Sequence, residues 1–581
     1  MKKADQQTPI YFYCGLAILF VLFLIHPWVG PDIWYHLSIG RSVWENKAAM
    51  PPNLTVLNQP GFVNFYWLFQ LICFSIYQTG GHVVLSLFFV LLWAGIAWNW
   101  FRIARPLRFG WLGFFLALIS LLIIQRRFEE RPEILAYLIL AMQIRWALMW
   151  NPHRRIGVKL WISVFVSEIF LSSVHGYFIF GPAIFGLRAV CSSLDKTKPR
   201  TQRYWFQILS VIALLFTCTV ITPLGIQNWK GVLALAEILH SPAAAMISEF
   251  HSVQLRYPQD YVFWGGCLAT LVAAIEVGRR NRKFWFHSAL SLVGVALSAD
   301  VLRNLPLLIL FSAPMWRISL RKIKLKKQFL KPLRIFAGVS LVGLSILVVT
   351  DEYYHLTKNP NTFGLGISQE LYPHKFVEYG KAQNLKGPVF NDPNYGGFLE
   401  YHLPHMKIYS DSRYCNSELV LEYFNALTQP ENFSYLDTKS QFQGIILDIA
   451  QSKTLVAPLL RHPDWVLAYA DAQNAYFSKD KTIKTDLRFF RGENLTTVPY
   501  HHFATTWLIN LADTGRNDLM LIALKQLAAQ DRIPSSVMGV ALQYSLFSKD
   551  SELIQNAKAL RGKLAASNEE EIRQIDSLMM Q

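Results

Sequence analysis

The chain has 581 residues, of which 52% are hydrophobic, 14% are aromatic and only 16% carry a charge. Soluble domains carry about 25% charged residues, so this composition excludes a protein that is soluble throughout. The net charge of +17 comes from Lys and Arg residues that lie between apolar blocks, which is the pattern of cytoplasmic loops. We therefore expect no nucleic-acid partner.

Apolar segments alternate with short basic loops as far as about residue 350. A helix needs about 20 mostly apolar residues to cross a bilayer, and these segments predict an all-α bundle of about eleven transmembrane helices. The predicted spans are Ile10–Trp28, His82–Phe101, Phe109–Ile124, Ile134–Trp150, Val158–Ser173, Tyr177–Val190, Trp205–Ile221, Tyr261–Val277, Phe284–Leu297, Leu305–Met315 and Ile335–Thr350.

The segment Val63–Gly80 is also apolar, but it is rich in aromatic residues and is interrupted by Asn64 and Gln70. We predict that it is a helix lying along the membrane interface. With this assignment and a cytoplasmic N-terminus, every strongly basic loop falls on the cytoplasmic side, as the positive-inside rule requires. The loop 29–80 and the chain after residue 350 are then expected outside.

The sequence predicts three domains: a transmembrane domain over residues 1–350, a periplasmic α/β domain over 351–490 and a helical tail over 491–581. The tail is similar to antiparallel tetratricopeptide-like helix pairs, without a clean repeat. In the α/β domain the pattern predicts short strands at Pro388–Asn391, Phe398–His402, Lys407–Ser410 and Gly444–Leu447, helices at Ser417–Leu427 and Ser452–Leu460, and a hairpin at Trp465–Lys479.

Asp32 and His36 follow the first span and stand four residues apart. A helix there would place both side chains on one face. A carboxylate and an imidazole on one face can act as a general base with its orienting partner, or as two ligands of a metal. The alternative is a helix cap next to an interfacial histidine.

The outer loop Gln125–Glu133 carries six charges, three of them arginines. Arginines on the outer side run counter to the positive-inside pattern, and guanidinium groups match the geometry of phosphate and carboxylate groups. Glu129 and Arg131 of this loop are therefore candidate binding residues. The alternative is a solvated turn before a helix that begins at Pro132.

Further polar residues lie in the remaining outer turns, namely His175, Glu249, Arg303 and Asn304. Each alone is explained by a turn, a solvated acid or an ion pair. Together they place acidic, imidazole and guanidinium groups on one rim of the bundle. Ionisable groups near membrane depth are functional candidates.

In the outer domain, Asn391–Gly397 and Tyr409–Arg413 are loops rich in Asn, Asp, Ser and Gly. These residues are the ordinary chemistry of turns, so a structural role is favoured there.

The stretch Pro31–Gly40 resembles an Asp-x-Trp-x-His-Leu-x-x-Gly segment of a group of bacterial polytopic proteins, which are similar to the GT-C superfamily of membrane glycosyltransferases. The similarity extends to about Lys479. The later segments that match the group in order are Arg131-Pro132, His175-Gly176, Pro223-Leu-Gly225, Glu249-Phe250, Arg303-Asn304, Asp392–Gly397 and Asp411–Arg413.

The resemblance implies a bacterial inner-membrane enzyme that moves a sugar from a polyprenyl-phosphate-linked donor to a periplasmic acceptor. It assigns Asp32 as the general base, Glu249 as a second acid, and Arg131 and Arg303 as ligands of the lipid phosphate. His36 is expected to orient Asp32, and Glu129, His175 and Asn304 are expected to contact substrate. This chain departs from the family by having one acid and a histidine where paired acids are common.

Two other functions remain open from the sequence. One is a ligase or polymerase of surface polysaccharide, and the other is a non-enzymatic scaffold for envelope assembly that docks partners on the helical tail. The sequence leaves open which sugar and carrier are used, and whether the acceptor is a glycan, a lipid or a protein. It also leaves open whether a divalent metal ion takes part.

Overall fold

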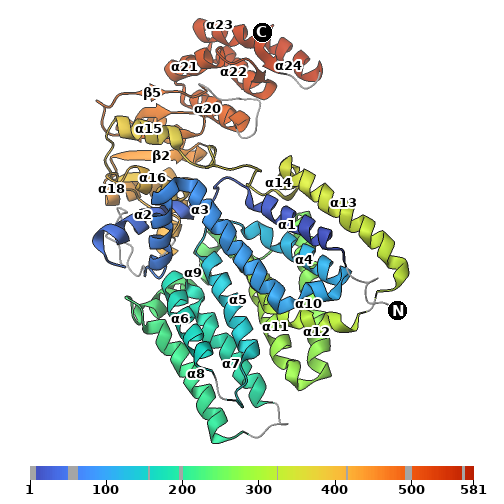
Figure 1. Ribbon diagram of the computed structural model, residues 1–581. Helices are drawn as coiled ribbons and strands as arrows, with labels where there is room; N and C mark the ends of the chain where they lie inside the picture. Colours follow the sequence, from blue (N-terminus) through green and yellow to red (C-terminus); the bar gives the residue numbers. More distant parts are fainter. Residues whose placement is uncertain are drawn as a thin grey trace. The chain divides into compact units, whose positions relative to one another are not determined.

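The computed structural model describes residues 8–49, 63–154, 157–194, 200–323, 325–413, 417–449, 451–490, 500–565 and 569–580 (Figure 1). The chain divides into two compact units. The long N-terminal part of the first unit ends at Ser368, and the second unit contains nearly all of the chain from Gln369 onward.

Helices make up the first unit, and every predicted span coincides with one of them. They are α1 (Ile10–Leu24), the second half of α3 (Trp67–Ala104), α4 (Trp111–Ile124), α5 (Glu133–Met149), α6 (Val158–Val174), α7 (Phe180–Ser193), α8 (Gln202–Val220), α10 (Pro258–Arg280), α11 (Trp285–Asp300), α12 (Leu305–Ser319) and α13 (Leu330–Val349).

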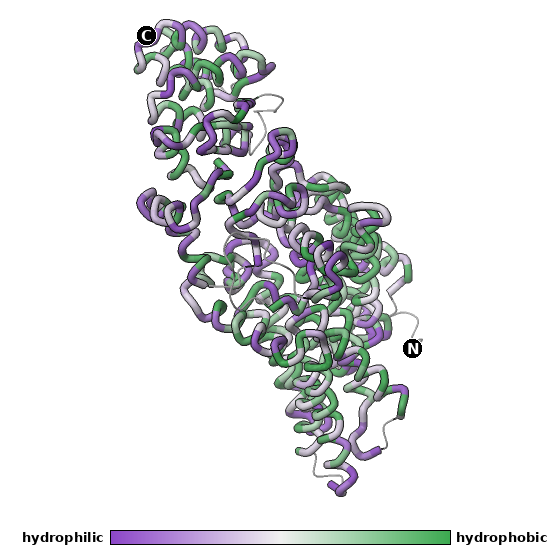
Figure 2. The backbone as a smooth tube through the Cα atoms, turned by 90° about the vertical axis from the view of Figure 1, so that its left-hand side faces the viewer, coloured by the Kyte–Doolittle hydropathy of each residue, from purple (hydrophilic) through white to green (hydrophobic). Residues whose placement is uncertain are grey.

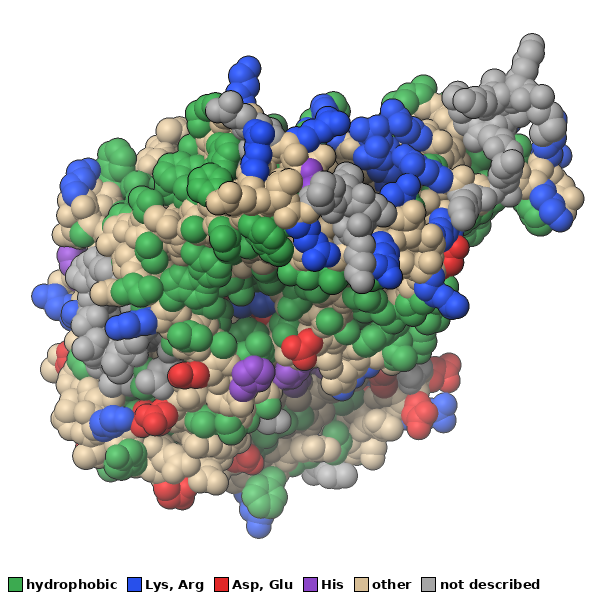
Figure 3. Space-filling model, turned by 90° about the horizontal axis from the view of Figure 1, so that it is seen from below, with side chains coloured by type: hydrophobic (Ala, Val, Ile, Leu, Met, Phe, Trp, Pro, Cys, Tyr) green, Lys and Arg blue, Asp and Glu red, His purple; other side chains and the backbone are tan. Residues whose placement is uncertain are grey.

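Among the described residues, four stretches are long and apolar enough to cross a membrane by length and composition: α3, α8, α10 and residues 327–349. Large apolar side chains on the outside of these helices, such as Leu91, Val272 and Val339, are at least 60% exposed. Such a surface suits contact with lipid rather than water. Figure 2 shows hydrophobic colour along long stretches of the chain, and Figure 3 shows broad hydrophobic areas beside a gathering of Lys and Arg side chains.

Helix α3 is kinked at Gly80 and Gly81. Gly81 has a φ of 63°, a backbone conformation that glycine adopts without steric cost. The kink separates the aromatic-rich first half, which begins at Trp67, from the apolar second half. The sequence predicts two separate helices, Val63–Gly80 and His82–Phe101. The kink lies at the boundary between these two predicted segments.

Helix α2 (Asp32–Asn46) packs along the first half of α3. The contact is close at Gly40, where an added Cβ would lie 2.3 Å from the main-chain oxygen of Gln70 and 2.8 Å from Cβ of Phe74. Only a glycine lets the two helices approach this far. The glycine of the Asp-x-Trp-x-His-Leu-x-x-Gly motif thus has a structural role. It lets α2, the helix that carries the acid of the motif, pack closely against α3.

The second unit contains a five-stranded sheet in the order β1-β2-β4-β3-β5. Strand β1 (Val389–Asn391) runs parallel to β2 (Gly444–Asp448), with Val389 opposite Gly444. Strands β3 (Val466–Ala470) and β4 (Asn474–Ser478) form the predicted hairpin, and β5 (Asp486–Leu487) pairs with β3.

The prediction of a strand at Phe398–His402 is wrong, because these residues end helix α16 (Pro393–His402). The side chain of Asp392 caps the helix by accepting from the amide of Asn394, and Pro393 occupies the first turn. Gly396 lies against the chain near Ser410, with space for no Cβ. Gly396 therefore serves close packing of a helix, and the two glycines do not form a turn between strands.

The helical tail consists of α20 (Tyr500–Thr514), α21 (Asn517–Leu527), α22 (Ser535–Ser548), α23 (Ser551–Ala559) and α24 (Glu569–Met579). Its apolar residues share one core with the sheet, from Phe390 to Ile575. Trp507 of α20 also donates from its indole nitrogen to the carbonyl of Asp471 over 2.8 Å. The remaining helices around the sheet are α15 (His374–Ala382), α17 (Ser417–Thr428), α18 (Pro430–Ser440) and α19 (Lys453–Arg461).

Candidate active site

Arg131 joins three acidic side chains that are far apart in the sequence. Its Nη1 lies 3.2 Å from Oδ2 of Asp32, at the start of α2, and its Nε lies 2.6 Å from Oε2 of Glu129. Its Nη2 pairs with Glu249, in the short 3₁₀ helix Ser248–Phe250. The Arg131 side chain is 8% exposed, so this guanidinium is used almost fully by carboxylates of the protein.

A second pair lies on the same network. Arg303 Nη2 is 2.5 Å from Oε1 of Glu133, the first residue of α5. The Glu133 side chain is buried at 2% exposure, whereas Arg303 keeps 19%. Nε2 of His175 lies 4.0 Å from the same Glu133 oxygen.

Arg127 links the acids around Arg131 to the Arg303–Glu133 pair. Its guanidinium nitrogens are 3.7 to 3.9 Å from carboxylate oxygens of Glu129, Glu133 and Glu249. Four carboxylates and three guanidinium groups thus form one partly buried charged cluster: Asp32, Glu129, Glu133 and Glu249 with Arg127, Arg131 and Arg303. Pairing of this kind is what makes buried charge tolerable.

The cluster sets the protonation of its members. Burial by itself raises the pKa of Glu249, but the positive charges of Arg131, Arg127 and Arg303 outweigh it and lower the pKa to about 2. Burial lowers the pKa of His175 to about 4, against the opposing effect of Glu133. At neutral pH Glu249 is therefore a carboxylate and His175 a neutral imidazole.

Neutral His175 is fixed in orientation, because its Nδ1 accepts a hydrogen bond from the amide of Tyr177 over 3.0 Å. The proton of the imidazole then sits on Nε2, on the side of Glu133. Tyr177 in turn donates from its hydroxyl to Oδ1 of Asn304 over 2.6 Å. Asn304, predicted as a binding residue, holds this tyrosine beside the cluster.

His36 lies where α2 contacts α3. It is fully buried between α2 and α3, where its Nδ1 lies 3.3 Å from Nε2 of Gln70. Gln70 is itself held by Asn64, which donates to its side-chain oxygen over 2.8 Å. The polar residues Asn64 and Gln70, which interrupt the apolar segment, are therefore partners in a buried chain that fastens α2 to α3.

An apolar cavity of about 180 Å³ lies beside the cluster. Its walls come from α9 (Gln227–Leu239), from α7 and from the segments around Phe65 and His175. Five polar side chains are among its lining residues: Tyr66, His175, Tyr177, Asn304 and Arg303. Among the described lining residues, Arg303 carries the positive charge.

The sequence analysis placed seven candidate residues on one rim of the bundle, and all of them lie in or beside the cluster. They are Asp32, Glu129, Arg131, His175, Glu249, Arg303 and Asn304. It did not single out Arg127, Glu133 or Tyr177. The charge density of the loop Gln125–Glu133 was the available signal for the first two. Nothing in the local sequence distinguishes Tyr177 from other aromatic residues next to spans.

The same loop contains Glu130, a further acid that the sequence did not single out. It is 6% exposed, and burial raises its pKa to about 8. It is therefore largely protonated at neutral pH and lies outside the ion-pair network.

A metal site would need several carboxylate, imidazole or thiolate ligands close together. Within the described parts of the chain, no three His, Cys, Asp or Glu residues are arranged to hold one. The carboxylates of the cluster are instead paired with arginines.

No protein-family model matches the chain, and no curated protein matches it. Sixteen chains of solved structures do. One is the archaeal oligosaccharyltransferase AglB from Archaeoglobus fulgidus, in complex with an inhibitory peptide and a dolichol-phosphate, with a TM-score of 0.48 and 9% identity over 77% of this chain and 70% of that chain. Another is ArnT from Cupriavidus metallidurans bound to undecaprenyl phosphate, with a TM-score of 0.34 and 13% identity over 82% of this chain and 99% of that chain.

With TM-scores of 0.48 and 0.34 the likeness is partial. The function proposed next is therefore built on the residues of this chain.

Proposed function

We propose that the chain is a membrane glycosyltransferase that moves a sugar from a polyprenyl-phosphate-linked donor to an acceptor outside a bacterial inner membrane. One observation carries the proposal: an apolar cavity that exposes a single guanidinium lies beside a partly buried cluster that contains Asp32. A lipid phosphate needs such a combination, with apolar walls for the chain and a cation for the head group.

Arg303 is the residue proposed to bind the phosphate. Of the three clustered arginines it is the most exposed, at 19% against 8% for Arg131 and 4% for Arg127, and it lines the cavity. Arg131, an equal candidate by sequence, is held by three carboxylates. Its proposed role is to position Asp32 and Glu249.

Asp32 is the proposed general base. Its side chain keeps 16% exposure and lies 3.2 Å from Arg131, and a neighbouring positive charge favours the carboxylate that a base must present. In the transfer, the acceptor oxygen bonds to the anomeric carbon of the sugar. The bond from that carbon to the phosphate oxygen breaks, its electron pair stays on the phosphate beside Arg303, and the acceptor proton passes to Asp32.

The binding half of the proposal is tested with undecaprenyl phosphate as the probe. Loss of a hydrogen-bonded charge costs about 1.5–3 kcal/mol, so Arg303→Ala should weaken binding by about tenfold or more. Arg126→Ala is the matched control, because Arg126 is also 19% exposed and pairs with an acid, Asp260, at 2.7 Å, but does not line the cavity. Equal affinities in both variants and in the wild type would refute the phosphate site.

The chemical half is tested by the release of undecaprenyl phosphate from a panel of undecaprenyl-phosphate-linked sugars. General-base catalysis contributes roughly 100- to 10,000-fold, so Asp32→Asn should lower turnover at least about tenfold while the affinity for undecaprenyl phosphate is kept. Normal turnover in this variant would remove Asp32 from the mechanism. A silent Asp32→Asn together with loss of function on deletion of the helical tail would favour the scaffold.

A further inference from the structure

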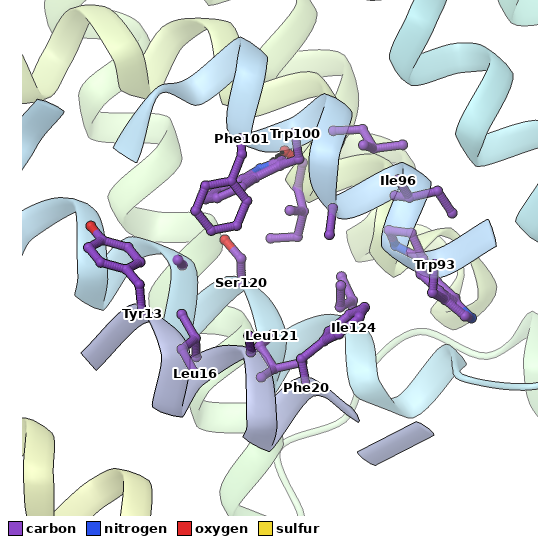
Figure 4. A pocket seen from close by; sticks show the side chains of 16 residues that line it. Tyr13, Leu16, Phe20, Trp93, Ile96, Trp100, Phe101, Ser120, Leu121 and Ile124 are labelled. Carbon is purple, nitrogen blue, oxygen red and sulfur yellow. Dashed lines mark hydrogen bonds between the residues drawn. The ribbon is translucent and has the colours of Figure 1, made fainter. Parts of the chain in front are cut away.

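A second cavity, of about 150 Å³, lies inside the first unit among α1, α3, α4 and α12 (Figure 4). Tyr13, Leu16 and Phe20 of α1 form one wall, and Trp93 and Trp100 are among the α3 residues that line it. Its lining contains none of the residues of the charged cluster. The proposed transferase mechanism does not use it.

The lining is almost entirely apolar. Four lining residues carry polar side-chain atoms: Tyr13, Trp93, Trp100 and Ser120. Three of these donate to main-chain carbonyls, Tyr13 Oη over 3.4 Å, Ser120 Oγ over 2.7 Å and Trp100 Nε1 over 3.2 Å. A buried water needs two to four polar partners, and a cavity without them stays dry and accepts apolar molecules. The apolar walls therefore favour a hydrocarbon ligand.

Small residues create the hollow. Ala17, Ala97 and Ala117 face it from three different helices, while the bulky side chains of Phe20 and Trp93 stand at its edges. An engineered apolar cavity of about 150 Å³ binds benzene, so this one has room for roughly one isoprenoid unit or a similar length of acyl chain.

The cavity opens toward the surface of the bundle between α1 and α3. Ala17 is exposed, and Phe20, Ala97 and Phe101 are only half-buried. The outer faces of these helices carry apolar side chains, with Ile18 61% and Leu91 62% exposed. In a bilayer this opening would face lipid chains.

We propose that the cavity is a binding site for the hydrocarbon chain of a membrane lipid, separate from the site at the charged cluster. The chain enters between α1 and α3 and packs on Phe20, Trp93 and Trp100. Two lipids carry suitable chemistry, a phospholipid with its acyl chain and a polyprenyl lipid with its isoprenoid chain. Photolabelling with one probe for each lipid distinguishes the two.

The test uses the full chain reconstituted in lipid, with two photoreactive probes: a phosphatidylcholine with a diazirine on its acyl chain, and a polyprenyl phosphate with a diazirine on its isoprenoid chain. Labelled residues are mapped by mass spectrometry. We expect one probe to label cavity residues such as Phe20 or Leu121 in the wild type. The probe that does so identifies the source of the chain, and labelling of these residues by neither probe overturns the proposal.

Ala97→Phe places a ring in the cavity and should reduce this labelling by about tenfold, because the closely packed walls leave no second space of that size. Ala94→Phe is the matched control, one turn away on α3 at an exposed position outside the lining, and should keep it. Ala17→Phe fills the opening from α1 and repeats the test if Ala97→Phe does not fold. Unchanged labelling in a folded filling variant would overturn the proposal.

Discussion

Replacing Gly40 by Ala tests whether the close contact of α2 with α3 positions the acid of the site. The new Cβ would lie 2.3 Å from the oxygen of Gln70, whereas Cβ atoms in proteins essentially never approach heavy atoms within 3.0 Å. Helix α2 must therefore move by roughly 0.7 Å or more. Both obstructing groups, the Gln70 carbonyl and Cβ of Phe74, belong to the backbone or its first side-chain atom and cannot rotate away.

Asp32 lies on the same helix, eight residues before Gly40, and moves with it. At a rise of about 1.5 Å per residue the two are about 12 Å apart along the axis, so even a small tilt shifts the carboxylate relative to Arg131. A displacement near 1 Å at a reacting group costs about a hundredfold in rate, and overpacking costs about 1–3 kcal/mol of stability. We expect Gly40→Ala to lower turnover by about tenfold to a hundredfold and to lower the melting temperature.

The assay compares turnover, affinity for undecaprenyl phosphate and thermal unfolding in detergent. Gly186→Ala is the control, because Gly186 lies in α7 and an added Cβ there meets nothing within 4 Å. Ala at an unobstructed helical glycine should be neutral or stabilise by up to about 1 kcal/mol. Wild-type turnover and melting temperature in Gly40→Ala would refute the reasoning that this contact holds Asp32 in place.

Two further predictions concern buried carboxylates. The folded pKa of Glu249, about 2, lies below its ordinary value of 4.5, so its ion pairs stabilise the fold above about pH 5 and this stabilisation is lost as the pH falls toward 2. At neutral pH it amounts to about 3 kcal/mol. The stability difference between the wild type and Glu249→Gln should shrink by about half between pH 7 and pH 3 in denaturation measurements, and a constant difference would contradict the assignment. In the second unit, Arg413 bonds both Asp411 and Glu400 at 6% exposure or less. Arg413→Met should destabilise this unit by about 3–5 kcal/mol, seen as early proteolysis of the full chain after residue 368, whereas Arg413→Lys keeps the charge and should lose less; equal protease resistance in all three would show that the pairs carry no stability.

The sequence alone determined the apolar helices of the first unit, because long apolar runs have few alternatives to helices. Each predicted span coincides with a helix, and the break at Gly80-Gly81 was visible as a change in composition. Charge placement also brought the candidate acids and arginines to one rim of the bundle. The number of helices that cross the membrane, the membrane side of each loop and the three-domain division remain predictions.

Tertiary structure decided how those candidates pair. Arg131 and Arg303 are equal candidates by sequence, and only the packing shows that three carboxylates pair with Arg131 while Arg303 faces a cavity. It also placed His36 against Gln70 of α3. The physical reason is that ion pairing and burial depend on residues brought together from distant loops, such as Asp32 and Glu249, and no local pattern encodes those distances.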